Sequence, residues 1–168
     1  YAEVMGVAAL TYTNEKASYS TPGDAVDLAA PGGDAGSDST RQLYSTWSRQ
    51  AKENCGKKQS YLGHYLEING GAYCYDAGTS MATPLVSSIA ALVWSASPGL
   101  TNDEVVSVLK NTTFPLAPPP REVGTGLVDA AAALRSLIPP SLQSSPTGLL
   151  YELTSGSVSF PVGVRLDN

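Results

Sequence analysis

The sequence predicts an α/β fold built on parallel strands, and three features of the 168-residue chain support this prediction. Residues 3–10 form a short apolar run of small side chains, which is typical of a strand buried on both faces. Residues 26–30 form a second strand, which Pro-Gly-Gly stops. A long apolar helical pattern then begins at Ser80. Strands that are buried on both faces need helices to cover them, so we expect a sheet packed against helices.

The helix behind Ser80 is expected to end near Ala96, because Ser-Pro-Gly follows it. Thr79 or Ser80 can cap its first turn, and Pro84 falls near the end of that turn. The side expected to face the core carries apolar residues at helical spacing: Met81, Leu85, Ile89, Leu92 and Val93.

Two further helices are expected, over about 102–111 and 130–137. Thr101 and Glu104 form a capping-box pattern that opens the first of them. The second is rich in alanine, a strong helix former. Three apolar residues are expected on the buried side of the first helix: Val105, Val106 and Leu109.

The composition allows a real hydrophobic core and argues against several classes of partner. Hydrophobic residues make up 42% of the chain, and the net charge is −5. A negative charge argues against a general nucleic-acid or membrane-surface binder. No run approaches 18 apolar residues, so no transmembrane helix is expected, and no signal-peptide pattern opens the chain.

Ser80 combines three features that suit a nucleophile. It follows a loop of small residues, it lies at the start of a helix, and the first turn of a helix has free backbone N–H groups. A serine hydroxyl there can attack a carbonyl while nearby N–H groups receive the developing negative charge. The alternative for a single serine at this position is an ordinary cap on a core helix.

Four segments resemble, in the same order, signatures of the subtilisin-like serine proteases, or subtilases. The stretch 78–84 reads G-T-S-M-A-T-P and resembles the family's nucleophile motif. A-S-Y-S at 17–20 and D-L-A-A-P-G at 27–32 resemble a second signature. G-x-G-L-V-D-A at 124–130 resembles the segment that closes the catalytic domain.

The resemblance implies that residues 1–138 are the C-terminal portion of a subtilase catalytic domain, with helices on both faces of a parallel sheet. It makes Ser80 the catalytic nucleophile of a serine endopeptidase that acts on polypeptide substrates. The Asp, the His and the oxyanion Asn of the family are expected upstream of Tyr1, in an N-terminal half that acts as partner. His64 lies in Leu-Gly-His-Tyr-Leu, which does not match the family's histidine motif, so it is not expected to be the base. The alternatives are a non-catalytic pseudoprotease and a processed structural fragment.

Cys55 and Cys74 are the two cysteines of the chain. If they pair, the disulfide closes a loop of about 20 residues and contributes roughly 3 kcal/mol in the chain-entropy model. The other reading is two unpaired thiols. A disulfide indicates an oxidising compartment, and together with the family resemblance it predicts an extracellular protein.

Two stretches carry weaker signals. Residues 33–72 show no strong periodicity and read as an irregular loop insertion, either a basic rim on the binding cleft or a solvated surface loop. Residues 139–148 are rich in Pro and Ser and read as a linker. Within the tail 149–168, the segments 149–153 and 158–166 read as β, either as an edge hairpin or as the start of a C-terminal extension.

No cofactor follows from the residues themselves. Calcium is common in the family, and the resemblance allows a weak cation site of backbone carbonyls near Tyr1 and Val4. Carbonyl ligands leave no sequence signature, so no metal ligand is assigned. Neither nucleic acid nor a membrane is expected as a partner.

Overall fold

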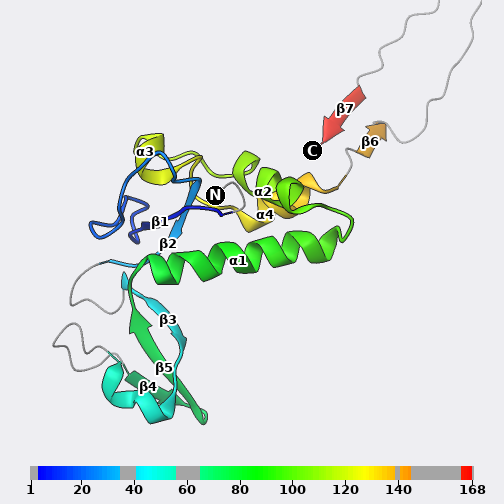
Figure 1. The fold of residues 1–168 in the computed structure, drawn as a ribbon. Coiled ribbons are helices and arrows are strands. Elements are labelled where there is room, and N and C mark those ends of the chain that lie inside the picture. The colour runs from blue at the N-terminus through cyan, green and yellow to red at the C-terminus, as the bar shows by residue number, and fades with distance from the viewer. Residues whose placement is uncertain (1–3, 35–40, 56–64, 139–140, 145–163, 168) are drawn as a thin grey trace, which may run out of the picture.

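The computed structural model describes residues 4–34, 41–55, 65–138, 141–144 and 164–167. In Figure 1 a long helix, α1 (Thr79–Ala96), runs across the middle of the molecule. A parallel strand pair and the other helices lie on one side of α1, and a second, antiparallel sheet projects from its N-terminal end on the other side.

The parallel pair consists of β1 (Val7–Leu10) and β2 (Leu28–Pro31). Leu127 continues the sheet beyond β2, because Ala29 donates to Gly126 O at 2.8 Å and accepts from Val128 N at 2.9 Å. The two predicted strands and their parallel pairing are therefore confirmed.

Helices cover both faces of this pair. On one face lie α1, α2 (Asn102–Asn111) and α4 (Ala130–Ser136), and on the other face lies α3 (Pro120–Val123). The core of the first face is built mainly from small side chains: Ala9, Leu28, Ala30, Ala82, Val86, Val93, Val105, Leu109, Val128 and Ala133. The core of the second face is smaller: Ala8, Leu10, Ala29 and Val123. This α/β arrangement confirms the predicted fold class.

The buried side of α1 differs from the predicted one. Ala82, Val86 and Val93 are buried, whereas Leu85 is 36% exposed and Leu92 is 51% exposed. The strands below present mainly alanines, so the helix packs most closely where its own side chains are small. Hydrophobic spacing alone cannot identify this side, because apolar residues occur all round the helix.

The predicted cap of α1 is also wrong. Gly78 occupies the N-cap and makes no side-chain hydrogen bond, while Thr79 and Ser80 already lie inside the helix. Pro84 lies in the second turn, where its missing N–H leaves the carbonyl of Ser80 without the usual helical donor.

The capping box of α2 is as predicted, and α4 has an Asp129 cap that was not among the predictions. Thr101 and Glu104 form both hydrogen bonds of a capping box, and Asp129 Oδ1 accepts from Ala132 N at 2.8 Å. Of the three apolar residues assigned to the buried side of α2, Val105 and Leu109 are buried and Val106 is 36% exposed.

The second sheet corrects the prediction of an irregular segment over 33–72. Its strands β3 (Leu43–Thr46), β4 (Tyr65–Ile68) and β5 (Gly71–Asp76) pair antiparallel in the order β3-β5-β4, with the 3₁₀ segment η2 (Arg49–Asn54) beside them. Asn69 and Gly70 both have positive φ and form the tight β4–β5 turn, and Asn-Gly between two strands is a typical hairpin sequence. Cys55 and Cys74 form a disulfide, with Cα atoms 6.0 Å apart.

In the tail, β6 (Ser141–Ser144) pairs antiparallel with β7 (Val164–Asp167). The predicted linker over 139–148 therefore contains a strand. Of the two predicted β segments, the second overlaps β7, and residues 149–163 lie outside the described residues.

By length and composition, α1 is apolar enough to cross a membrane, which was not expected from the sequence. The same helix packs against β1, β2, α2 and α4. Such packing is the behaviour of a core helix, and the exposed apolar residues of α1 are those on its unpartnered side.

Candidate active site

Ser80 lies in the first turn of α1 with an exposed side chain. The strands β1 and β2 both end close to the loop that precedes it, because Gly32, the residue after β2, contacts this loop. The carboxyl ends of parallel strands are where open α/β sheets bind their ligands. The fold therefore presents Ser80 at the edge of the sheet where a site is expected.

Two backbone hydrogen bonds fix the Ser80 loop to the sheet. Gly78 N donates to Gly32 O at 2.8 Å, and Gly32 N donates to Leu10 O at 2.9 Å. A Cβ on Gly32 would collide with Ala9 Cβ and come within 3.0 Å of Gly78 O. Only glycine allows the loop to lie this close to the end of β2, so the position of Ser80 depends on Gly32.

Tyr19 stabilises the same contact between the Ser80 loop and the end of β2. Its hydroxyl donates to Gly33 O at 2.5 Å and also lies next to the position of Gly32. Burial and the negative charge of Asp34 raise the pKa of Tyr19 to about 12, with a smaller contribution from Asp76 and an opposing hydrogen bond at Gly78. The phenol therefore stays protonated and remains a donor throughout the neutral range.

In the first turn of α1, some backbone N–H groups are already bonded and one is free. Met81 N and Ala82 N both donate to Gly78 O, at 3.0 and 3.3 Å. Within the described part of the chain, the N–H and the hydroxyl of Ser80 make no hydrogen bond. Both groups are thus free to act on a bound substrate, and the N–H also benefits from the positive end of the helix dipole.

The other catalytic groups predicted for the site are not brought to Ser80 by the described residues. His64 lies outside the described residues. Among residues 4–34, 41–55 and 65–138, no histidine occurs and no side chain hydrogen-bonds to Ser80 Oγ. The described residues thus contribute one serine hydroxyl and one backbone N–H, both without a hydrogen bond, at the start of α1.

Calcium does not gain support from the side chains. The described residues contain no group of three His, Cys, Asp or Glu side chains that could hold a metal ion. Val4 is 69% exposed, and Tyr1 lies outside the described residues. A site of backbone carbonyls near Tyr1 and Val4 is not tested by these side chains and stays a prediction.

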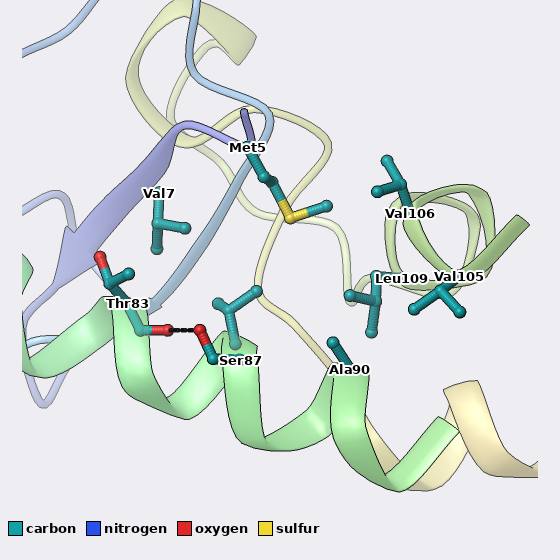
Figure 2. A pocket seen from close by; sticks show the side chains of 9 residues that line it. Met5, Val7, Thr83, Ser87, Ala90, Val105, Val106 and Leu109 are labelled. Carbon is teal, nitrogen blue, oxygen red and sulfur yellow. Dashed lines mark hydrogen bonds between the residues drawn. The ribbon is translucent and has the colours of Figure 1, made fainter. Parts of the chain in front are cut away.

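A separate cavity of about 280 Å³ lies further along α1, between this helix, β1 and α2 (Figure 2). Met5 and Val7 line one side, Ala90 lies on the helix, and Thr83 and Ser87 are joined by a 3.2 Å hydrogen bond from the Ser87 hydroxyl to the Thr83 carbonyl. Its lining contains no ionisable side chain and does not include Ser80. The cavity is an apolar groove and carries no catalytic chemistry.

Gly32 and Tyr19 were not recognised as site residues from the sequence. Both belong to segments that resemble the family signatures, A-S-Y-S and D-L-A-A-P-G. Their order ahead of the serine motif is the sequence signal that they belong with it.

Comparison with known proteins agrees with the geometry. A family model described as the subtilase family matches residues 1–143. Alkaline elastase YaB from a Bacillus species is 33% identical over 80% of this chain. The halolysin-like extracellular serine protease Nep from Natrialba magadii is 31% identical over 80% of it. The chain spans only 28% and 19% of the lengths of these two proteins.

Solved structures give the same result. A protease from Pseudoalteromonas arctica is 36% identical and superposes with a TM-score of 0.62, covering 80% of this chain and 36% of its own. Fervidolysin from Fervidobacterium pennivorans is 29% identical with a TM-score of 0.63, covering 79% and 19%. The fold, the order of the motifs and the match over residues 1–143 establish that this chain belongs to the subtilase family.

Proposed function

We propose that this chain carries the nucleophile of a secreted subtilisin-like serine endopeptidase and that Ser80 is that nucleophile. The observation that carries the proposal is the exposed, unbonded Ser80 hydroxyl at the N-terminus of α1, beside the carboxyl ends of β1 and β2. The chain covers a minor share of its relatives, so the remaining catalytic groups are assigned to an N-terminal half of the same protease. We call the two parts together the complete protease.

The reaction is an acyl transfer. The Ser80 hydroxyl gives its proton to the histidine of the N-terminal half, which the aspartate orients, and Oγ bonds to the scissile carbonyl carbon. The carbonyl oxygen becomes an oxyanion, which accepts hydrogen bonds from Ser80 N–H and from the asparagine of the other half. The histidine returns the proton to the leaving amine as the C–N bond breaks. Water then attacks the acyl-enzyme by the same route and restores Ser80.

The edge of β1 supports the assignment of a second half. At Ala9, the edge of β1 that faces away from β2 is covered by other parts of the chain. Ala17 N donates to Ala9 O there, and Ala9 N donates to Ser20 Oγ. Around Val7 no described residue pairs with this edge, and the apolar groove of Figure 2 lies at the same place. An unpaired edge beside an apolar groove suits one more parallel strand. We assign this strand to the N-terminal half.

Secretion is supported by two observations. The Cys55–Cys74 disulfide requires an oxidising compartment, and the similar protein Nep is named as extracellular. The substrate is a polypeptide, as the reaction class requires.

The proposal is tested by hydrolysis of a peptide anilide with the complete protease and with each half alone. We expect turnover only when both halves are present. Ser80→Ala should lower kcat by about 10⁴-fold or more, since it removes the nucleophile. Ser88→Ala is the matched control, because Ser88 is an exposed serine on the same helix whose hydroxyl bonds only to Pro84 O. Full activity of Ser80→Ala would show that Ser80 is not the nucleophile. No turnover by the wild-type complete protease would indicate a pseudoprotease or a structural fragment.

A further inference from the structure

The small sheet β3-β5-β4 has two unlike faces. Ala72 and Cys74 point to one face and are buried, because η2 covers them through the Cys55–Cys74 disulfide. Lys52 of η2 adds a contact on this face, with its Nζ 4.8 Å from the centre of the Tyr65 ring. The centre of this face, around Ala72 and Cys74, is therefore buried.

The opposite face is apolar, and no helix or strand among the described residues is placed over it. The strand register places five aromatic or aliphatic side chains on it, which we call the tyrosine face: Tyr44, Leu66, Ile68, Tyr73 and Tyr75. Tyr44 stacks on Tyr73 at 5.0 Å between ring centres and meets Tyr75 at 4.7 Å. Tyr44 is 41% exposed and Ile68 is 48% exposed.

This distribution is the reverse of the usual one. An antiparallel sheet with one covered face normally turns polar residues to water. Here the strand register places the charged residues Glu67 and Asp76 on the same face as Ala72 and Cys74. The five residues of the tyrosine face carry no charge. A contiguous apolar patch on a protein surface marks a binding site. Tyrosine offers a large contact area at a low cost in side-chain entropy, which suits a partner of variable sequence.

The course of β5 indicates the partner. β5 ends at Asp76, and only Ala77, Gly78 and Thr79 separate it from Ser80. Tyr75 therefore lies within about 18 Å of the nucleophile, since an extended residue spans at most about 3.6 Å. A polypeptide held at Ser80 is long enough to extend to the tyrosine face on one side of the scissile bond. A tetrapeptide, which spans at most about 14 Å, has much less length with which to do so.

We propose that the tyrosine face is an exosite for the unfolded polypeptide substrate, which binds apolar and aromatic stretches at a distance from the cleaved bond. The proposal rests on the function proposed for Ser80 and adds a second contact region for the same substrate. It requires that substrate length decides whether the face contributes to binding.

The test compares a tetrapeptide anilide with β-casein, an unfolded polypeptide, as substrates of the complete protease. The double variant Tyr44→Ser/Ile68→Ser removes two exposed apolar side chains. It should raise KM for casein roughly tenfold, because exposed aromatic contacts at an interface each contribute severalfold in affinity. The KM and kcat for the tetrapeptide should stay unchanged. Phe114→Ser is the control, since Phe114 is 58% exposed and lies outside this sheet.

Binding is measured separately from activity. In a Ser80→Ala background, the Kd for fluorescein-labelled casein, read by anisotropy, should rise roughly tenfold with the double variant. Leu66→Ser gives an independent variant on the same face, with an expected rise of about threefold. If the wild-type complete protease does not hydrolyse the tetrapeptide, the function proposed for Ser80 is refuted. The Kd measurement with labelled casein would still test the exosite.

Three results would overturn the exosite. The first is an equal loss for tetrapeptide and casein, which would mean a structural role for the face. The second is no change in the Kd for casein. The third is a change from dimer to monomer in sedimentation with the double variant, which would assign the face to contacts between copies of the chain.

Discussion

The backbone N–H of Gly78 donates a 2.8 Å hydrogen bond to the carbonyl of Gly32. This bond joins the loop before the candidate nucleophile to the end of β2, so the sheet and the start of α1 are positioned together. Neither residue has a side chain to recognise a substrate. Their contribution is a close approach of two backbone segments, which places the Ser80 hydroxyl and N–H on the same side of the sheet edge.

Gly32→Ala should disturb this junction. The added methyl group would collide with Ala9 and crowd Gly78 O, so the loop must shift, at a cost of about 1–3 kcal/mol. We expect a lower unfolding midpoint and a fall in kcat of the complete protease that is larger than any change in KM. Gly23→Ala is the matched control, because nothing lies within 4 Å of a Cβ at Gly23. Equal effects of the two substitutions would contradict the role of the junction.

Tyr19→Phe should remove the hydrogen bond to Gly33 O and leave a buried carbonyl without this donor, costing about 1 kcal/mol. The same variant has a signature in alkali. The folded protein holds the pKa of Tyr19 near 12, against an ordinary value of 10.0. The unfolded chain therefore releases this proton first, and stability falls as the pH rises from about 10 to about 12.

The measurement is chemical unfolding across pH 9–12. Tyr19→Phe should show a shallower loss of unfolding free energy over this window than the wild type. Tyr12→Phe is the control, because Tyr12 is a tyrosine whose side chain is 58% exposed. An identical alkaline slope in wild type and Tyr19→Phe would refute the assignment.

Asp27, the residue before β2, links the start of β1 to α2. Its carboxylate accepts from Gly6 N at 2.8 Å and from Lys110 Nζ at 2.7 Å, so it ties the start of β1 to α2. Burial alone would raise the pKa of Asp27, but the hydrogen bonds from Lys110 and Gly6 and the charge of Lys110 outweigh it and lower the pKa below its ordinary value.

Asp27→Asn should therefore destabilise the protein by about 1 kcal/mol at neutral pH. A lowered pKa means that this contribution is present above the ordinary pKa of aspartate, near 3.8, and is lost as the pH falls further. The difference in unfolding free energy between wild type and variant should shrink below about pH 4. Asp24→Asn serves as control, since its pair with Arg121 is largely exposed. A difference that stays constant from pH 7 to pH 3 would count against the ion pair.

The disulfide should stabilise the small sheet. Replacing Cys55 and Cys74 by serine frees a loop of about 20 residues and should cost roughly 3 kcal/mol in the stability of β3-β5-β4. Because Cys74 faces η2 and not α1, the tetrapeptide activity should change little, while thermolysin should cleave the sheet faster. Ser45→Ala, at the residue paired with Cys74, is the control. Complete loss of tetrapeptide hydrolysis would show that the sheet supports Ser80 directly.

The sequence predicted the central part of the fold because several local signals agreed there. The strands at β1 and β2 are short runs of small apolar residues, and the capping box at Thr101 fixes the start of α2 through hydrogen bonds between neighbours in the chain. Such signals depend on nearby residues alone. They do not require knowledge of the tertiary structure.

The predictions that were wrong or missing concern features that are set by tertiary packing. The buried side of α1 is set by the alanines of the facing strands, so Ala82 is buried and Leu92 is not. The strands β3 and β4 of the small sheet have four residues each, too short for a periodic signal. Its turn at Asn69–Gly70 was readable, but its pairing with β3 across the η2 segment was not. For the site, the motif predicted Ser80, while the packing of Tyr19 and Gly32 around it required the folded chain.

The central claim is that Ser80 is an activated nucleophile, and a fluorophosphonate probe tests it most directly. Such probes bond covalently to serines whose hydroxyl is activated by a base. We predict that the complete protease becomes labelled at Ser80, as mapped by peptide mass spectrometry, and that the label is absent in Ser80→Ala and retained in Ser88→Ala. An intact complete protease that remains unlabelled at Ser80 would contradict the account.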